Sequence, residues 1–437
     1  MFIGLDFGTT NSALAFADPQ GRARLAPIHH GTEYLSTFRS LLYYDPEERD
    51  RNNRPLSFAG PFAKDAYLER GAEGRLIQSI KSYLANPHFT STQIFGARFT
   101  LENLIAHLIA GLIDATDDPV RLSETLANTP IVVGRPARFV RSSQGETDDG
   151  HDEFALDRLA WALKTVPIGE VVFEFEPVAA AYAYEQTLDR DELVLIGDFG
   201  GGTSDFCLLH VGPGYRTLGS RAETIVGVSG VGLAGDAFDA RLVENVVAPA
   251  LGYGTFYDSQ GKRLPVPAWL YDTLKRWHLV SFINTAKTRR MLQMIEKTAE
   301  APEAVEALAR LIAEEQAFAL HGAVEATKVA LSKGERARFR HRLSPLDLDV
   351  DVSRADFETW IAPELAAIGA CVDELMETTG IASGMVDRVF LTGGSSFIPA
   401  VRDLFAERFG AGKLAGGNEL TSVATGLALS ARARFAQ

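Results

Sequence analysis

A seven-residue pattern occurs twice in this chain, and the copies lie 192 residues apart, close to half of the 437 residues. The copies are Asp6-Phe7-Gly8-Thr9-Thr10-Asn11-Ser12 and Asp198-Phe199-Gly200-Gly201-Gly202-Thr203-Ser204. Each follows an apolar run, places an aspartate before a turn rich in Gly, Thr or Asn, and leads into a second apolar run, as a β-hairpin does. A repeat at this spacing predicts two copies of one lobe.

The rest of the sequence predicts alternating strands and helices in an α/β chain. Apolar residues at helical spacing predict a helix over 101–115, and further helices are expected over 178–184, after Pro399 and over 421–434. Strands are expected over 129–133, 171–175 and 388–392. The segment 253–320 begins with a loop rich in Gly and Pro and continues as a helical insertion. We therefore predict lobe I over 1–187, with an insertion at about 31–100, and lobe II over 188–437, with a mostly helical insertion at about 241–322.

The chemistry of the two turns points to a phosphate ligand. Glycine lets backbone N–H groups approach an anion closely, and an aspartate at the end of a strand can hold Mg²⁺ through water. One such turn could be an ordinary hairpin. The matching aspartates and threonines, with a third turn at Gly393-Gly394-Ser395, favour two loops that hold one polyphosphate.

Composition and the absence of several sequence motifs exclude or disfavour several classes of function. A formal net charge of −14 disfavours nucleic acid as a partner. The basic run Arg336–Arg342 is interpreted as a solvated loop or strand edge. Two distant cysteines, no apolar run long enough to span a membrane, and no basic leader favour a cytoplasmic protein. The GxxxxGK[ST], HRD, GxSxG and HExxH motifs are absent from the sequence.

Four segments together resemble the nucleotide-binding domain of DnaK-type heat-shock chaperones, and most closely its short YegD-like members. They are GLDFGTTNS (Gly4–Ser12), FEPVAAAYAY (Phe175–Tyr184), GDFGGGTSD (Gly197–Asp205) and TGGSSFIP (Thr392–Pro399). The resemblance implies a duplicated actin-like ATPase fold of the ribonuclease H type. It also implies ATP/ADP and Mg²⁺ as cofactors, with K⁺ considered as a further cation.

The resemblance assigns roles to residues of this chain. It implies phosphate binding by Gly8, Thr9, Thr10 and Asn11 and by Gly200, Gly201, Gly202 and Thr203. It implies that Asp6 and Asp198 hold Mg²⁺ through water and that Thr203 and Asp205 complete the metal shell. Lys64 would bind the γ-phosphate, and Glu176 would orient the attacking water. The remaining nucleotide contacts implied are Gly235, Asp236, Glu325, Lys328, Val329, Ser332, Gly393, Gly394, Ser395 and Phe397.

The sequence departs from the family at two points. Val329 and Phe397 stand where the family places two arginines around the adenine, and the lost cation–π contacts, about 1–4 kcal/mol, are comparable with burial of a Phe face, about 1.5–3 kcal/mol. ATP binding is therefore expected to persist. The chain stops at Gln437, soon after the last predicted helix, so we expect no peptide-binding domain.

Four functions remain open at this point. The first is a slow ATPase of the chaperone family, in which lobe closure on ATP is the output. The second is a nucleotide-gated binding module that does not hydrolyse ATP. A small-molecule kinase and a filament-forming protein on the same fold are the others. Expected partners are chaperone, co-chaperone or client proteins, with no nucleic acid and no membrane, and the chain is expected to be a monomer.

Overall fold

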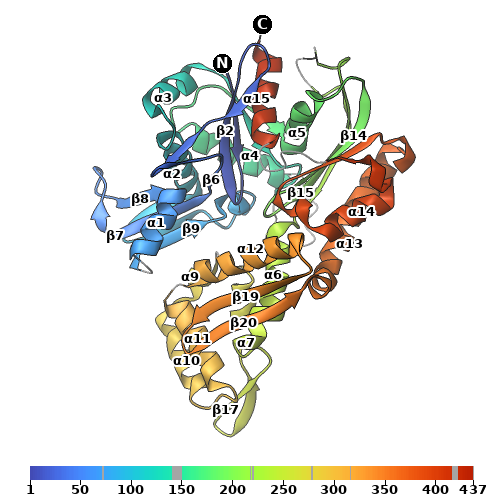
Figure 1. Ribbon diagram of the computed structural model, residues 1–437. Helices are drawn as coiled ribbons and strands as arrows, with labels where there is room; N and C mark the ends of the chain where they lie inside the picture. The colour runs from blue at the N-terminus through green and yellow to red at the C-terminus, as the bar shows by residue number, and fades with distance from the viewer. Residues whose placement is uncertain are drawn as a thin grey trace. The chain divides into compact units, whose positions relative to one another are not determined.

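The chain forms two compact units in a computed structural model (Figure 1). The structure describes residues 1–70, 73–139, 150–216, 218, 221–276, 279–314, 316–415 and 422–436, without the side chains of 281 and 282. Unit 1 comprises Met1–Gly235, Ala367–Phe397 and Val401–Gln437, and unit 2 comprises Asp236–Ala366 and Ile398–Ala400. This division differs from the expected lobe boundary at 187/188, which stays a prediction.

Unit 1 contains two large sheets, each with one copy of the repeated hairpin. The first has the order β13-β12-β1-β2-β3, and β6 also pairs with β2; the strands are β1 (Phe2–Phe7), β2 (Asn11–Ala17), β3 (Ala23–Leu25), β6 (Phe38–Arg39), β12 (Ile131–Arg135) and β13 (Val171–Phe175). The second has the order β16-β15-β14-β21-β22; its strands are β14 (Glu192–Phe199), β15 (Ser204–Val211), β16 (Ile225–Val231), β21 (Arg388–Thr392) and β22 (Leu414–Ala415). In both sheets the first hairpin strand pairs parallel to one neighbour and antiparallel to the other. The five-strand paths therefore match in order and direction.

The two hairpins also match in register. Phe7 pairs with Ser12 across the first turn, and Phe199 pairs with Ser204 across the second, so each turn has four residues. Both hairpins confirm the sequence prediction. One position further along the pairing, Asp198 faces Asp205.

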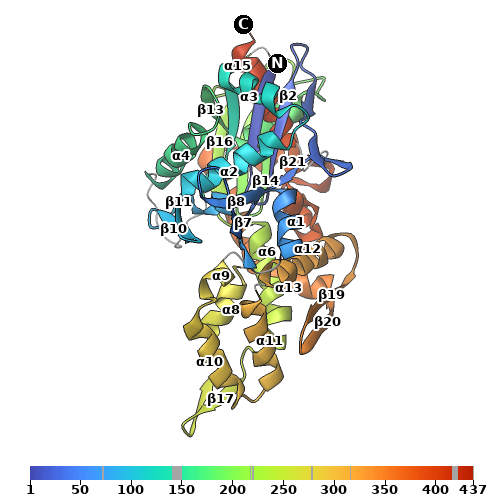
Figure 2. The same cartoon turned by 90° about the vertical axis from the view of Figure 1, so that its left-hand side faces the viewer.

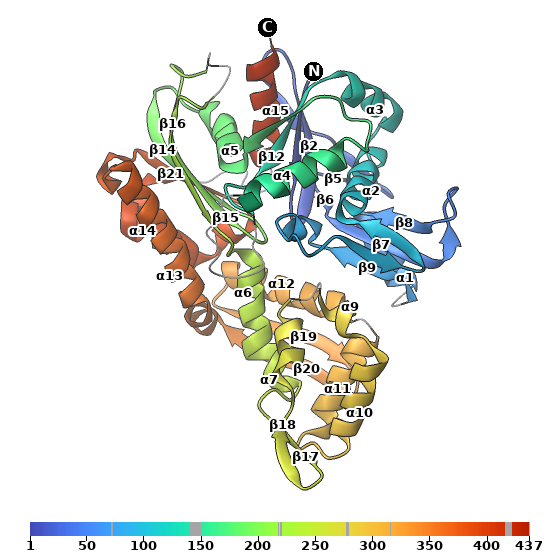
Figure 3. The same cartoon turned by 180° about the vertical axis from the view of Figure 1, so that it is seen from behind.

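Two helices, α5 (Glu176–Glu185) and α15 (Ser422–Phe435), lie between the sheets (Figures 1 and 3). Small residues allow this close approach. A Cβ added to Gly426 would lie 1.7 Å from the carbonyl oxygen of Ala179 on α5, and one added to Gly4 would lie 2.3 Å from the backbone nitrogen of Ala428 on α15. Helix α5 begins two residues before its predicted start, because Pro177, which lacks an N–H, suits a first helical turn.

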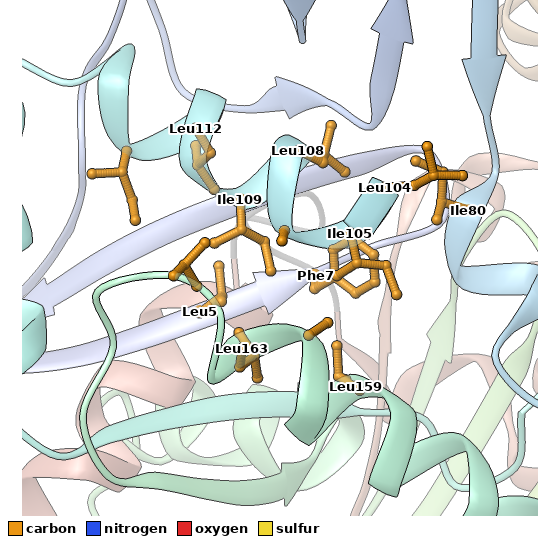
Figure 4. Packing of buried hydrophobic residues seen from close by; sticks show 14 of the residues in the cluster. Leu5, Phe7, Ile80, Leu104, Ile105, Leu108, Ile109, Leu112, Leu159 and Leu163 are labelled. Atoms are coloured by element: carbon orange, nitrogen blue, oxygen red, sulfur yellow. The ribbon is translucent and has the colours of Figure 1, made fainter. Parts of the chain in front are cut away.

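The opposite face of the first sheet is covered by α2 (Leu101–Asp114) and α4 (Gly150–Leu163), with α3 (Pro119–Asn128) beside them (Figure 2). Helix α2 starts with a capping box, in which Thr100 and Asn103 exchange side-chain and backbone hydrogen bonds. Leu5 and Phe7 of β1 point toward apolar side chains of α2 and α4 (Figure 4). This core confirms the helix that apolar spacing predicts over 101–115.

The segment predicted as the first insertion carries a small sheet in the order β8-β7-β9. Its elements are β7 (Leu41–Arg49), β8 (Pro55–Ala59), α1 (Pro61–Arg70), β9 (Arg75–Gln78) and the 3₁₀ turn η2 (Ile80–Tyr83). Two short hairpins, β4 (Ile28–His30) with β5 (Glu33–Leu35) and β10 (Ser91–Ile94) with β11 (Ala97–Thr100), flank it in the chain. Helix α14 (Pro399–Phe409) begins at the predicted proline.

Unit 2 is mostly helical. It contains α6 (Gly235–Leu242), α7 (Ala248–Ala250), α8 (Ala268–Leu274), α9 (Val280–Ile283), α10 (Ala286–Glu296), α11 (Pro302–Ala313), α12 (Ala317–Lys333), the start of α13 (Arg354–Thr379), and the hairpins β17 (Phe256–Ser259) with β18 (Lys262–Pro265) and β19 (Arg336–Leu343) with β20 (Leu346–Ser353). The hairpin β17–β18 corrects the expected loop there, since Gln260 and Gly261 adopt the positive φ of a tight turn. The basic run lies on β19, where its arginines are exposed, as predicted. Within the described part of the chain, no helix has the length and apolarity needed to cross a membrane.

Candidate functional site

The first repeated turn has a shape that requires glycine. A Cβ at Gly8 would lie 2.0 Å from the carbonyl oxygen of Asn11, a distance that no side chain tolerates. In the second turn the N–H of Gly200 donates to the carbonyl of Thr203 at 3.0 Å, and a Cβ at Gly200 would make only ordinary contacts. The first turn therefore requires glycine at position 8 for steric reasons. At Gly200 of the second turn a side chain would cause no clash, so sterics do not explain the glycine there.

Ser40 holds the first turn in place, and no motif in the sequence predicts this role. Its N–H donates to the carbonyl of Thr10 at 2.9 Å, and its hydroxyl donates to the carbonyl of Gly8 at 2.7 Å. The hydroxyl also lies 3.0 Å from that of Ser12. These bonds satisfy the carbonyls of Gly8 and Thr10 within the protein. Backbone N–H groups of such a turn are the groups that can bind an anion.

The third glycine turn lies against the end of β14, close in the fold to Asp198. Gly393 has φ of +82°, and a Cβ there would lie 2.2 Å from the carbonyl oxygen of Phe199. Gly394 follows in the same turn and is exposed, while Ser395 is buried and Phe397 is exposed. The structure thus brings the Gly393 turn to the strand that carries Asp198.

Three aspartates of unit 1, Asp6, Asp198 and Asp205, lie within electrostatic range of Glu176. Glu176, Asp198 and Asp205 are 7%, 7% and 1% exposed, and Asp6 is partly buried. Burial and then the charge of Glu176 raise the pKa of Asp6 to about 7. The same two causes raise the pKa of Asp205 to about 7 and the pKa of Asp198 well above its ordinary value. The structure therefore gathers Asp6, Glu176, Asp198 and Asp205 into one buried acidic cluster, which we call the carboxylate cluster.

The lysine that meets this cluster is Lys81, which the sequence analysis missed. Its Nζ lies 2.5 Å from Oε1 of Glu176, and both side chains are buried. Although burial opposes it, the charges of Glu176 and Asp6 raise the pKa of Lys81. Lys64, the lysine chosen from the sequence, is exposed on α1, and its role at the γ-phosphate stays a prediction. Local sequence offers only a weak signal for Lys81, a charged residue in a short segment that also contains Ile80, Tyr83 and Leu84.

Asp205 also connects the second sheet to the loop after β12. Its Oδ1 accepts the N–H of Ala137 at 2.7 Å and that of Arg138 at 3.3 Å. A Cβ at Gly230 would lie 2.7 Å from the same oxygen, so β16 must present a glycine there. Because Oδ1 already accepts two N–H groups, Asp205 has a structural task besides the predicted place in a metal shell.

The donor chemistry of the carboxylate cluster fits Mg²⁺. All four side chains offer oxygen, the ligand atom that Mg²⁺ prefers. Lys81 and Arg135, both within electrostatic range of Glu176, supply two positive charges against four carboxylates. Among the described residues, no group of three or more His, Cys, Asp or Glu is placed to hold a metal directly. The predicted contacts run through water, so the metal stays a prediction.

Five predicted nucleotide contacts belong to unit 2: Asp236, Glu325, Lys328, Val329 and Ser332. Four of them lie on α12, where Lys328 pairs with Asp239 of α6 at 2.8 Å. Burial acts to lower the pKa of Lys328, but the charge of Asp239 acts in the other direction, and the net effect is a raised pKa. Val329 is exposed on this helix. Gly235, a predicted nucleotide contact that belongs to unit 1, donates its N–H to the carbonyl of Gly200 at 3.3 Å. The adenine slot of Val329 and Phe397 stays a prediction, since these residues belong to different units.

Two comparisons relate this chain to known proteins. The family model described as Hsp70 protein matches residues 303–434. The Chaperone protein DnaK of Deinococcus proteolyticus is 24% identical over 441 residues, which cover 98% of this chain and 58% of that relative. The chain thus spans less than two thirds of the length of the relative it matches. The family match contains α12 and the Gly393 turn, and the alignment with the relative covers nearly the whole chain. Both matches support kinship of this chain with DnaK/Hsp70-type proteins.

Proposed function

We propose that this chain binds Mg-ATP in unit 1 and hydrolyses it slowly. The observation that carries the proposal is the carboxylate cluster, four acidic side chains gathered in a fold region that also holds three glycine-rich turns. Keeping carboxylates together away from water is unfavourable unless cations compensate their charge. A divalent cation that arrives with a polyphosphate would provide that compensation.

The proposed fold is the duplicated actin-like ATPase fold. Its support is the matching order and direction of the five-strand paths, together with the matching four-residue turns. Two related sheets place their equivalent aspartates, Asp6 and Asp198, at equivalent strand ends. A duplicated fold therefore explains why Asp6 and Asp198 occupy equivalent positions, while Asp205 is a further aspartate of the second hairpin.

In the proposed complex, the two hairpin turns hold the phosphates and the carboxylates organise the reaction. The N–H groups of Gly8–Asn11 and Gly200–Thr203 would donate to phosphate oxygens from two sides. Mg²⁺, when bound, supplies positive charge to the phosphates. Glu176, at the first turn of α5, would accept a hydrogen bond from the attacking water and so orient it. Because phosphoryl transfer depends mostly on positioning and charge, no covalent intermediate with the protein is needed.

The chaperone-like part of the proposal rests on kinship. The relative from Deinococcus proteolyticus carries the name of a chaperone, and by analogy we propose that client or co-chaperone proteins read the nucleotide state of this chain. The monomeric state and the cytoplasmic location stay predictions. No contact among the described residues favours the alternative functions of a small-molecule kinase or a filament-forming protein.

Calorimetry with Mg-ATP and single-turnover hydrolysis test the proposal together. The expected result is saturable binding that needs Mg²⁺, followed by slow release of phosphate. Asp198→Asn should weaken Mg²⁺-dependent binding about tenfold or more, because the carboxylate that would hold Mg²⁺ through water loses its charge. Asp403→Asn, on an exposed face of α14, is the matched control. Absence of heat with Mg-ATP would refute the proposal, whereas binding with intact ATP after hours would identify the nucleotide-gated module instead.

A further inference from the structure

Arg135 is the last residue of β12 and lies where the chain touches two members of the carboxylate cluster. Directly before it, a Cβ at Gly134 would lie 3.1 Å from Cγ of Glu176, so this carboxylate is confined against the backbone of β12. Two residues after it, the N–H of Ala137 donates to Oδ1 of Asp205 at 2.7 Å. The backbone of Arg135 is therefore held between Glu176 and Asp205.

The guanidinium of Arg135 is fixed by two contacts that leave its terminal groups unused. Its central carbon lies 4.7 Å from the centre of the ring of Phe175, the residue that pairs with Arg135 across β12 and β13. Its Nε donates to the carbonyl of Pro136 at 3.2 Å. These contacts occupy one face and one N–H of the group, so the N–H groups of Nη1 and Nη2 stay available.

The described part of the chain offers no partner to these terminal groups. Among the described residues, no carboxylate lies within ion-pair distance of Arg135, and the bond from its Nε is the one hydrogen bond of its side chain. Two other arginines of unit 1 differ, since Arg158 pairs with Glu102 at 2.7 Å and Arg434 pairs with Glu174 at 2.7 Å. Arg135 thus presents an unpaired cation from a half-buried position.

The carboxylates nearest in charge to Arg135 already have donors of their own. Burial lowers the pKa of Arg135, while the charges of Asp152, Asp205 and Glu176 act in the other direction. These three carboxylates accept, in that order, the N–H of Phe139 at 2.9 Å, the N–H of Ala137 at 2.7 Å and the ammonium of Lys81 at 2.5 Å. The terminal groups of Arg135 are therefore left for an anion that the described residues do not supply.

A phosphate is the anion that suits this arrangement. The two terminal nitrogens of a guanidinium lie in one plane and can donate to two oxygens of a phosphate at once, which a lysine cannot do. In the proposed complex, Glu176 orients the water that attacks the terminal phosphate of ATP. A guanidinium held beside Glu176 and Asp205 is therefore placed for the terminal phosphate and not for the two phosphates that ADP retains.

We infer that Arg135 is a phosphate-binding residue of the site, whose terminal N–H groups donate to two oxygens of the terminal phosphate of ATP. This inference rests on the proposed function and deepens it, because it assigns a direct nucleotide contact to a residue outside the sequence motifs. The contact with Phe175 fixes the guanidinium before nucleotide arrives, so little conformational freedom is lost on binding. After hydrolysis the same groups hold the released phosphate until it leaves.

The test compares Mg-ATP and Mg-ADP binding by calorimetry in the unaltered protein, Arg135→Met and Arg135→Lys. Arg135→Met keeps an apolar side chain against Phe175 and removes the charge, so it should weaken ATP binding about 10–100-fold. Because ADP lacks the terminal phosphate, its affinity should stay within about twofold of the unaltered value. Arg135→Lys keeps one charge without the planar pair of donors and should retain an intermediate preference for ATP over ADP.

Inorganic phosphate gives a second readout, and a distant arginine gives the control. Phosphate added to the Mg-ADP complex should bind about tenfold or more weakly to Arg135→Met than to the unaltered protein. Arg24→Met is the matched control, because Arg24 also lies over a ring of the same sheet, that of Phe16 at 5.8 Å, but on β3 at the other end of the strand order. The control should leave both nucleotide affinities and the phosphate affinity unchanged.

The outcomes separate this inference from the proposed function. If the unaltered protein binds no Mg-ATP, the proposed function fails, and phosphate titrated into the nucleotide-free protein then decides the role of Arg135. Binding that Arg135→Met abolishes would support that role, and absence of binding would overturn it. Where Mg-ATP does bind, full ATP affinity in Arg135→Met, or equal losses for ATP and ADP, would overturn the phosphate contact. A lower urea midpoint with an unchanged preference for ATP would identify a purely structural arginine.

Discussion

Replacing Asp205 by Asn should make the nucleotide-free protein more stable at neutral pH. Asp205 is 1% exposed, and burial, followed by the charge of Glu176, raises its pKa from 3.8 to about 7. The folded protein therefore holds this proton more tightly than the unfolded chain does. The contribution of Asp205 to the unfolding free energy falls as the pH rises from about 4 to about 7 and is constant above that range.

The magnitude follows from the size of the shift. A rise of about three pKa units corresponds to about 4 kcal/mol at pH 8, and somewhat more than half of this develops between pH 5 and pH 8. Asparagine carries no charge, and its Oδ1 can still accept the N–H groups of Ala137 and Arg138. The stability gap between Asp205→Asn and the unaltered protein should therefore grow by about 2–3 kcal/mol from pH 5 to pH 8.

Urea unfolding at several pH values, with EDTA present, measures this gap. Asp403→Asn, at an exposed position of α14, serves as the matched control substitution. A gap for Asp205→Asn that stays constant, or one that shrinks as the pH rises, would show that Asp205 is not held in an unfavourable charged state. The same substitution should also slow hydrolysis, so stability and activity would change in opposite directions.

Three further substitutions test other contacts. Gly134→Ala should lower kcat for ATP about tenfold or more with little loss of secondary structure by circular dichroism, because a Cβ would press on Glu176 at 3.1 Å; unchanged kcat would argue against the confined carboxylate. Gly426→Ala should lower the unfolding free energy by about 3 kcal/mol or more, because its Cβ would lie 1.7 Å from Ala179, and an unaltered melting temperature would refute the close packing of α5 and α15. Arg158→Met should cost about 3–5 kcal/mol in urea unfolding, because it leaves the partly buried Glu102 and the carbonyls of Tyr83, Asn86 and Phe89 without their donor. A cost below about 1 kcal/mol would contradict the expectation that Arg158 holds the segment after η2 in place.

The family match also separates two kinds of residue in this chain. The segment 303–434 contains α12 and the Gly393 turn, whereas the carboxylate cluster and Lys81 lie outside it. The likeness to DnaK over nearly the whole chain includes both regions at 24% identity. The positions of Lys81, Ser40 and Gly134 therefore rest on the geometry of this protein and not on the family model.

The sequence by itself determined the two hairpins, the glycine turns and most of the helices. Strand and helix periods are local, so β1–β2, β14–β15 and α2 follow from residues close together in the chain. Glycine requirements such as that of Gly8 also arise within one turn. The broken helices of unit 2 and the hairpin β17–β18 were not predicted, because Gly and Pro mark a turn without stating which strands flank it.

Only the tertiary structure decided which charged groups meet. Lys81 and Glu176 are 95 residues apart, and Asp205 accepts N–H groups from residues 68 and 67 positions away. A lysine on a short turn has the same local sequence signature whether it faces water or a buried carboxylate. The packing of Ile80 into the core and the glycine at 134 select between these outcomes, because they fix the backbone and leave room for Glu176. The sequence determined that Asp6 and Asp198 stand at equivalent strand ends. The fold decided that the cation near both of them is Lys81.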